Sequence, residues 1–246
     1  MSESIVIVGM ARTPMGGLQG ELAGFAAPDL GALAVKAAVR EAGVKDADQI
    51  IMGNVLSAGQ GQAPARQAAL KAGLSVGTQA VTLNKMCGSG LQAGAMARQA
   101  LLAGEADVVV AGGMESMSRA PFLLTSHRGG KKYGHDKMLD HMALDGLEDA
   151  YEGLAMGVYA DQAAKDYQLT RTSQDAYALE TLTRAQSATS EGRFKREIAA
   201  IELKGGAPID TDELPRKAKP EKIPSLKPAF TDGGTVTAAN ASAISD

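Results

Sequence analysis

Segments typical of buried strands alternate with segments typical of helices along the first half of this chain. Apolar runs with strand character occupy residues 50–56, 81–87 and 107–113, and helix-forming stretches lie between them. Parallel strands need a long crossover connection, usually a helix, whereas antiparallel strands are joined by tight turns. The alternation therefore predicts an α/β fold, with a parallel or mixed sheet that helices cover on both faces.

Capping residues mark the ends of the predicted helices. Asp29 is a typical N-cap residue, and apolar residues recur behind it with helical spacing as far as Gly43. Pro64 begins a shorter helix that stops at Gly73, since Pro favours the first turn of a helix and Gly the residue after the last. We expect one further buried strand, over residues 5–8.

The single cysteine, Cys87, lies where the strand over 81–87 meets a helix over 88–103. At a helix N-terminus the unpaired N–H groups favour the thiolate, which is the nucleophilic form. Gly88 and Gly90 would also let a substrate carbonyl approach the backbone closely. A buried structural cysteine is the common alternative for a free thiol. The local residues leave both interpretations open, and the small apolar side chains all round the helix predict that it is buried.

The second half of the chain has a different character. Residues 119–153 are polar and lack periodicity, so we expect a loop-rich insertion. Helices are expected over 158–167 and from an N-cap at Thr170 onward. Five prolines predict an irregular loop over 205–229. An apolar stretch over 235–242 is expected to return to the sheet.

We therefore expect three regions and a chain that is the first part of a longer protein. Ser245-Asp246 has the chemistry of a helix N-cap, yet no helix follows. The expected regions are a core over 1–118, an inserted loop domain over 119–230 and a return to the core over 231–246.

Composition excludes several classes of function. The chain has 246 residues and a net charge of -3, which argues against a nucleic-acid partner. One cysteine permits neither an intrachain disulfide nor a multi-cysteine zinc site. No apolar run approaches the roughly 18 residues of a membrane span, and the N-terminus lacks the pattern of a signal peptide. We expect a cytoplasmic protein that does not bind membranes.

The three histidines, His127, His135 and His141, all fall in the loop-rich insertion. Their spacing matches no familiar zinc pattern, and acidic ligands are not arrayed among them. We expect no metal site, and side chains that lie in a solvated loop.

The motifs of the chain resemble those of the thiolase family, specifically the acetyl-CoA C-acetyltransferase and 3-ketoacyl-CoA thiolase group. The stretch around Cys87 and the one ending at Ser118 are the most specific. The motifs are Arg12-Thr13-Pro14, Gly53-Asn54-Val55, Asn84-Lys85-Met86-Cys87-Gly88-Ser89-Gly90-Leu91-Gln92, Gly112-Gly113-Met114-Glu115-Ser116-Met117-Ser118, Ala229-Phe230 and Thr235-Val236-Thr237-Ala238-Ala239-Asn240-Ala241-Ser242.

The resemblance implies one half of a layered αβα sandwich with an inserted loop domain. It also implies that Cys87 is an acylated nucleophile in a reversible Claisen condensation of two acyl-CoA molecules, or in thiolysis of a 3-ketoacyl-CoA. Coenzyme A would be substrate and product, and no cofactor is implied. The backbone N–H of Cys87 would help to stabilise the oxyanion. The histidine and second cysteine of the family set would lie downstream of Asp246, so this chain alone is expected to be inactive.

The resemblance further implies which residues contact coenzyme A. Arg216 would meet the nucleotide end, Phe230 would pack nearby, and Ser242 would meet the pantetheine arm. Ala238 and Met156 complete this set. Short-chain members carry a histidine where this chain has Ala155. The space that alanine leaves would admit longer or branched acyl groups, unless neighbouring side chains fill it.

Membership of this group would also imply a homodimer or homotetramer and a place in fatty acid metabolism. Two alternatives share parts of the pattern. A condensing enzyme of the ketoacyl-synthase type has the same fold and nucleophile, but the motifs at Cys87 and Glu115 favour a thiolase. The second alternative is a non-catalytic thiolase-like protein that binds CoA or lipid, and the intact Cys87 argues against it.

Overall fold

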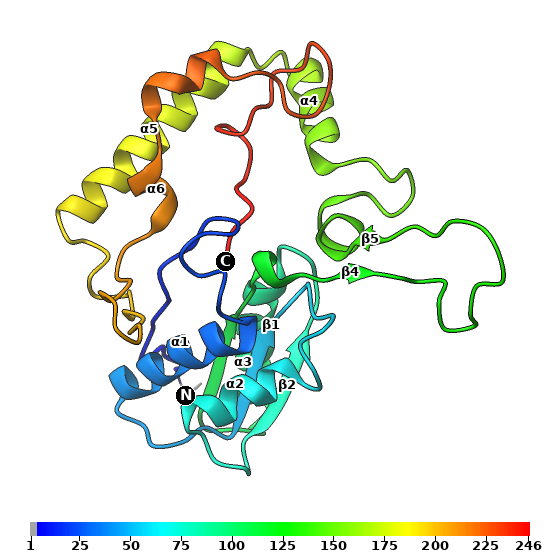
Figure 1. Ribbon diagram of the computed structural model, residues 1–246. Coiled ribbons are helices and arrows are strands. Elements are labelled where there is room, and N and C mark those ends of the chain that lie inside the picture. The colour runs from blue at the N-terminus through cyan, green and yellow to red at the C-terminus, as the bar shows by residue number, and fades with distance from the viewer. Residues whose placement is uncertain (1–3) are drawn as a thin grey trace.

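A small parallel sheet with its helices forms the first half of the molecule, and loops with two main helices form most of the second half (Figure 1). The computed structural model describes residues 4–246. The first half contains α1 (Ala27–Ala42), β1 (Gln49–Gly53), α2 (Pro64–Ala72), β2 (Gln79–Leu83), α3 (Ser89–Leu102) and β3 (Val109–Gly113). The second half contains the 3-10 helix η1 (Met117–Arg119), β4 (Phe122–Leu123), β5 (Leu139–Asp140), the π-helix η2 (Ala143–Leu147), α4 (Met156–Asp166), α5 (Arg171–Ser190), α6 (Glu213–Lys217) and the 3-10 helix η3 (Pro220–Ser225).

The sheet is parallel, and β1 lies between β2 and β3. Side chains alternate along β1. Ile50 and Met52 pack into the cluster under α1 and α2, whereas Ile51 packs against Ala93 and Ala97 of α3. The sheet is therefore covered on both faces, and the predicted α/β class and the layered αβα arrangement are confirmed.

The glycine signals predict the helix ends well. Gly43 ends α1 with a φ of 68° and Gly73 ends α2 with a φ of 95°, a left-handed backbone that suits glycine. The predicted N-cap of α1 is wrong by three residues. Ala26 is the N-cap, and Asp29 stands at the third helical position, where its carboxylate accepts the Ala26 N–H at 3.3 Å. Asp29 thus caps the helix from inside the first turn.

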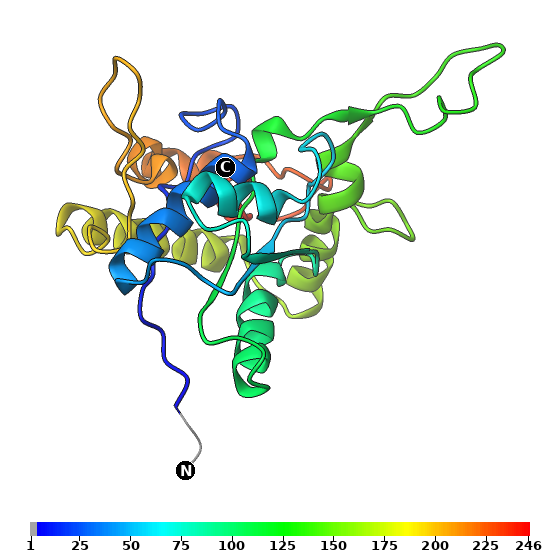
Figure 2. The same ribbon diagram turned by 90° about the horizontal axis from the view of Figure 1, so that it is seen from below.

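Two predictions of burial are wrong in this chain. Residues 5–8 form no strand, and Ile7 is 90% exposed; this segment runs away from the rest of the molecule (Figure 2). A strand needs a neighbour to take up its N–H and C=O groups, and no described residue does so here. The helix α3 packs on the sheet through one face only, and Leu91 on its other side is 85% exposed.

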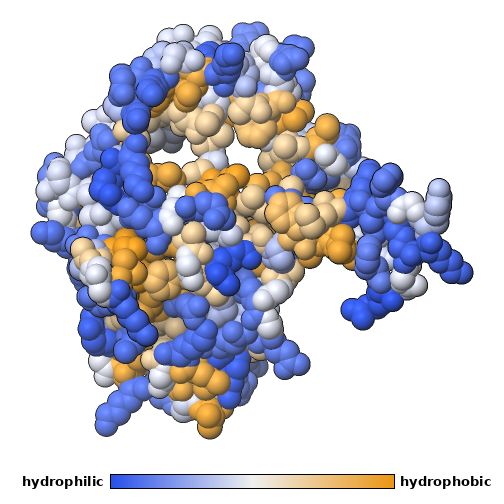
Figure 3. Space-filling view, in the orientation of Figure 1, coloured by the Kyte–Doolittle hydropathy of each residue, from blue (hydrophilic) through white to orange (hydrophobic). Residues whose placement is uncertain are grey.

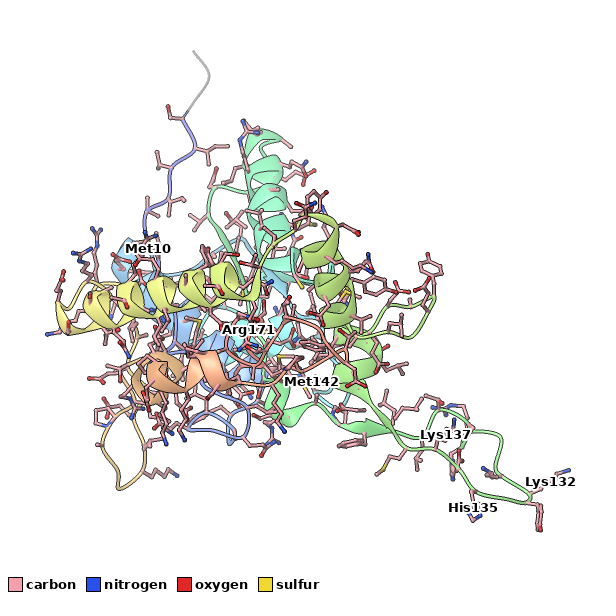
Figure 4. The ribbon with its side chains drawn as sticks, turned by 90° about the horizontal axis from the view of Figure 1, so that it is seen from above. Met10, Lys132, His135, Lys137, Met142 and Arg171 are labelled. Atoms are coloured by element: carbon pink, nitrogen blue, oxygen red, sulfur yellow. The ribbon has the colours of Figure 1, made fainter. Side chains whose placement is uncertain are left out.

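Residues 119–153 are loop-rich, as predicted, with a two-residue pairing of β4 and β5 among them. Lys132, His135 and Lys137 lie on an arm that projects into solvent (Figure 4). Thr170 caps α5, because its hydroxyl accepts the Ser173 N–H at 3.1 Å. The loop predicted over 205–229 instead contains α6 and η3.

The strand predicted over 235–242 does not form among the described residues, because side chains satisfy its backbone. The carboxylate of Asp161 accepts the N–H groups of Thr235 and Val236, which leaves them unavailable to a sheet. The division of the chain at 118/119 and 230/231 stays a prediction. No helix within residues 4–246 has the length and apolar character that a bilayer crossing requires.

Two buried acidic residues fasten the N-terminal loop to the inserted region. Asp212 accepts two hydrogen bonds from the guanidinium of Arg12, at 2.7 and 3.0 Å. The carboxylate of Glu213 accepts the N–H groups of Gly17 at 3.0 Å and Glu21 at 2.9 Å. These bonds fix residues 12–21, which approach the cavity described below.

Replacing Glu213 with glutamine is expected to weaken the dependence of the free energy of unfolding on pH under acidic conditions. Burial opposes ionisation of Glu213, but hydrogen bonds from Lys217, Glu21 and Gly17 outweigh it and lower its pKa from 4.5 to about 2. A folded-state pKa below the unfolded value stabilises the fold above pH 4.5, and this contribution is lost as the pH falls towards 2. Denaturant unfolding between pH 2 and 6 measures it.

The exposed Glu221, in the same region, provides the control as Glu221→Gln. The Glu221→Gln variant should keep the acid dependence of the unmodified protein. If Glu213→Gln also keeps it, the carboxylate of Glu213 does not fasten the loop.

Candidate functional site

Cys87 lies in the turn between β2 and α3, directly before Gly88, which is the N-cap of the helix. The strand β2 ends at Leu83, earlier than predicted, but the position of the thiol at the helix start is confirmed. The residue is exposed, so the structural-cysteine alternative of a buried thiol does not hold in this chain. It lines a cavity of about 470 Å³, together with Arg12, Asn54, Gly90, Glu115 and Asp246.

The turn that carries Cys87 is held in an uncommon conformation. Met86 has a φ of 48°, which a residue with a side chain rarely adopts. Asn84 Oδ1 accepts the Met86 N–H at 2.9 Å. The buried Ser89 Oγ donates to the Met86 carbonyl at 2.6 Å and accepts the Lys85 N–H at 2.9 Å. These three bonds fix the peptide that precedes Cys87.

The ends of the strands β1 and β3 lie against this turn. A Cβ at Gly53, the last residue of β1, would lie 2.6 Å from Ser89 Cβ and 2.9 Å from the Gly90 nitrogen. A Cβ at Gly113, the last residue of β3, would lie 3.6 Å from the Gly90 Cα, which is an ordinary contact, so only the approach of β1 requires a glycine. The helix start therefore rests on the carboxyl ends of two parallel strands, where α/β folds bind ligands.

The backbone N–H of Cys87 is a free donor within residues 4–246. The next two N–H groups are occupied, because Gly88 donates to Lys85 O at 3.1 Å and Ser89 donates to Met86 O at 3.0 Å. No acceptor among the described residues takes the Cys87 N–H. This is the arrangement that an oxyanion needs, since the donor is fixed in place and not yet used.

Glu115 and Asn54 join the two strand ends beside the cavity. The Glu115 carboxylate accepts the Asn54 Nδ2 at 2.6 Å and the N–H groups of Val55 at 2.8 Å and Leu56 at 3.1 Å. Burial raises the pKa of Glu115, against these hydrogen bonds. In the sequence the motif around Glu115 is only a family signature, and it does not predict this role, which depends on a contact between distant segments.

His141 is buried, so the expectation that all three histidines lie in a solvated loop is wrong for this one. Its Nε2 accepts the Ala58 N–H at 3.3 Å, which assigns the proton to Nδ1, 2.6 Å from Asp145 Oδ2. His127 pairs with Asp136 at 2.7 Å on the exposed arm. Across residues 4–246, no three His, Cys, Asp or Glu side chains are grouped so as to hold a metal ion.

The structure brings together some of the residues expected to contact coenzyme A. The ring of Phe230 lies on Gly157, where an added Cβ would be 2.3 Å from it, so Phe230 neighbours Met156 at the start of α4. Ala238 and Ser242 are exposed on the segment that follows. Arg216 lies elsewhere. It pairs with Glu21 at 2.6 Å and lines a separate cavity of about 540 Å³.

Apolar surface gathers between the helices α4 and α5 and the sheet (Figure 3). The segment over 229–246 crosses this region from α4 to the core (Figure 1). Its last residues reach the Cys87 cavity, since both Ser245 and Asp246 line it. The Cys87 cavity is thus lined by the end of this segment, whereas Met156, Phe230, Ala238 and Ser242 are not among its lining residues.

Met86→Val is expected to lower the free energy of unfolding by about 1–2 kcal/mol, because a β-branched residue strongly disfavours the left-handed backbone. Met86→Gly removes more side chain but accepts this φ, so it should cost less than the valine variant. Urea unfolding of both variants measures the difference. A glycine variant that is the less stable of the two would show that the Met86 side chain matters more than its backbone.

Comparison with known proteins gives consistent results. The family model "Thiolase, N-terminal domain" matches residues 5–246. Acetyl-CoA acetyltransferase of Saccharomyces cerevisiae is 46% identical over 256 residues, covering 100% of this chain and 64% of the relative. The enzyme of that name from Pseudomonas aeruginosa is 47% identical, covering 99% and 64%. A solved structure, Acat5 thiolase from Ascaris suum in complex with coenzyme A, superposes with a TM-score of 0.93 at 38% identity, covering 99% of this chain and 64% of the other. The chain thus spans about 64% of the length of these relatives.

Proposed function

The chain belongs to the thiolase family, and we propose that it forms the N-terminal, nucleophile-bearing part of an acyl-CoA acyltransferase. One observation carries the proposal. Cys87 is exposed to a cavity at the start of α3, on a fixed turn, with its own N–H free. A thiol in such a place is suited to attack a thioester carbonyl, and the N–H is suited to stabilise the resulting oxyanion.

The proposed reaction has two steps. The Cys87 sulfur attacks an acyl-CoA, the acyl group moves to Cys87, and the CoA thiol leaves with a proton. A second acyl-CoA then loses an α-proton and attacks the Cys87 thioester, which releases a 3-ketoacyl-CoA and the free thiol. Thiolysis of a 3-ketoacyl-CoA is the reverse. Coenzyme A is substrate and product, which the Ascaris thiolase solved with coenzyme A supports, and we propose no resident cofactor.

The proton transfers need groups that this chain does not supply. We propose that the complete protein provides a histidine that activates Cys87 and a second cysteine that moves the α-proton, as the family resemblance implies. Residues 1–246 alone are then inactive in both directions. The names of the relatives support an acetyltransferase over a ketoacyl synthase or a non-catalytic binding protein.

For coenzyme A we propose contacts with Met156, Phe230, Ala238 and Ser242. Arg216 would join only after its pair with Glu21 opens. Ser242→Ala should raise the KM for acyl-CoA by about three- to tenfold, which corresponds to one lost hydrogen bond. Steady-state kinetics with acetyl-CoA and with acetoacetyl-CoA measure it, and an unchanged KM for both would remove Ser242 from the site.

We also propose the wider biological setting that family membership suggests. The complete protein would act in the cytoplasm, in fatty acid metabolism, as a homodimer or homotetramer. Ala155, the N-cap of α4, lies beside Met156 and would leave the acyl site open to longer chains. Comparing kcat/KM for substrates of increasing length in Ala155→His and the unmodified protein would decide this point.

Trapping the acyl-enzyme tests the central proposal. The complete protein is mixed with labelled acetyl-CoA, quenched in acid and mapped by peptide mass spectrometry. The label is expected on the peptide that contains Cys87. Binding of acetyl-CoA without any label would favour the non-catalytic alternative, and label transferred only from an acyl carrier protein would favour the ketoacyl synthase.

A further inference from the structure

The segment over 229–242 carries three of the four proposed coenzyme A contacts, yet it contains neither helix nor strand. Such a segment cannot fix its own shape through backbone ladders. Some of its N–H groups have acceptors within the segment, as where Ala229 donates to Val236 O at 2.9 Å, and side chains of α4 and α5 supply further hydrogen bonds. The positions of Phe230, Ala238 and Ser242 therefore depend on side chains of α4 and α5 that are not among the proposed contacts.

Asp161 on α4 makes three of the hydrogen bonds between these helices and the segment. Its carboxylate accepts the Thr231 hydroxyl at 2.7 Å and the N–H groups of Thr235 at 2.7 Å and Val236 at 2.9 Å. The residue is only 9% exposed. Burial opposes its ionisation, but these hydrogen bonds outweigh it and lower the pKa of Asp161. One buried carboxylate thus accepts three donors from the span 231–236.

The fit between Asp161 and the segment is tight. A Cβ on Gly234 would lie 2.4 Å from Asp161 Oδ2, so the chain passes close against the carboxylate. The helix α5 adds weaker support. Its Gln174 donates to the Thr235 hydroxyl at 2.9 Å, and its Asp175 accepts the Asn240 Nδ2 at 3.2 Å. Arg171 orients Asp175 at 2.7 Å and lies near the centre of this region (Figure 4).

The chain on either side of residues 231–236 has anchors of its own. At one end Phe230 packs on Gly157, and at the other Asp246 receives the Ser118 N–H at 2.7 Å beside the Cys87 cavity. Asp161 fixes the middle. If its carboxylate lost its charge, the path between the two anchors would loosen, while the turn around Cys87 would keep all the bonds that hold it.

We propose that Asp161 is a positioning residue for substrate binding, which holds the 231–236 backbone so that the segment presents its side chains to the coenzyme A portion of the substrate. The inference rests on the proposed function. It assigns to Asp161 an effect on binding of the CoA portion and no effect on the chemistry at Cys87.

The test compares two acyl donors in the complete protein. One is acetyl-CoA, and the other is the N-acetylcysteamine thioester of acetate, which lacks the nucleotide and most of the pantetheine arm. Asp161→Asn places an amide N–H against backbone N–H donors and should raise the KM for acetyl-CoA about tenfold or more. The rate of Cys87 acylation by the short thioester should stay within about twofold of the unmodified protein. Asp166→Asn, an exposed residue on the same helix, is the matched control.

Thr231→Val is a second, milder variant, for use if Asp161→Asn does not fold. It removes one hydroxyl donor and should keep the fold. It should raise the KM for acetyl-CoA about threefold, with thermal unfolding confirming the folded state. An unchanged KM in a folded Thr231→Val or Asp161→Asn protein overturns the inference, as does an equal loss with both donors. If the unmodified protein is not acylated by either donor, the proposed function itself fails, which is a separate outcome.

Discussion

Replacing Cys87 with alanine is expected to abolish acyl transfer by the complete protein, with turnover falling by at least about four orders of magnitude. The side chain is the only thiol on this chain, it is exposed to the cavity, and it precedes the N-cap of α3. No neighbouring hydroxyl replaces it, because Ser89 is buried and both its hydrogen bonds are made within the turn. Steady-state rates in both reaction directions and acid-quenched labelling measure the loss.

The fold should be unaffected, since the Cys87 side chain is exposed and the bonds of the turn come from other residues. Coenzyme A should therefore still bind to Cys87→Ala with little change in affinity, which calorimetry detects. Turnover within tenfold of normal would show that another group is the nucleophile. Loss of coenzyme A binding together with turnover would show that the variant had lost its structure, and Cys87→Ser would then be the variant to use.

Gly53→Ala is expected to have the second largest effect, although the change is one methyl group. The new Cβ would lie 2.6 Å from Ser89 Cβ, 2.8 Å from the Ser89 carbonyl carbon and 2.9 Å from the Gly90 nitrogen. Two of these atoms are backbone, so no flexible side chain can move away. The start of α3 must shift instead, at a cost of about 1–3 kcal/mol in stability.

That shift would move the proposed nucleophile, Cys87, as well as the helix. A displacement of about 1 Å at a reacting group costs on the order of a hundredfold in rate, so kcat should fall by that amount. Cys87 alkylation by a small reagent and thermal unfolding, measured with kcat, separate misplacement from unfolding.

Gly24→Ala is the matched control, because nothing lies within 4 Å of a Cβ built there and its backbone is unstrained. It should leave both stability and kcat unchanged. If Gly53→Ala behaves like Gly24→Ala, then β1 does not support the turn as closely as the structure indicates.

The sequence predicted the elements whose signals are local. Gly43 and Gly73 end their helices because only glycine accepts the left-handed backbone at little cost, and this depends on the residue itself. The position of Cys87 at the start of a helix followed equally from its neighbours in the chain. The alternation of strands and helices predicted the parallel sheet, because a helix between two strands is the long crossover that parallel pairing requires.

Only the tertiary structure decided features that depend on distant partners. Asp161 and Glu115 are ordinary acidic residues in the sequence, and their roles arise because the fold brings backbone N–H groups to them from segments about 60 to 75 residues away. The same dependence explains the wrong predictions. Residues 5–8 and 235–242 have strand-like side chains, but a strand exists only where a neighbour completes its hydrogen bonds, and neither has one among the described residues.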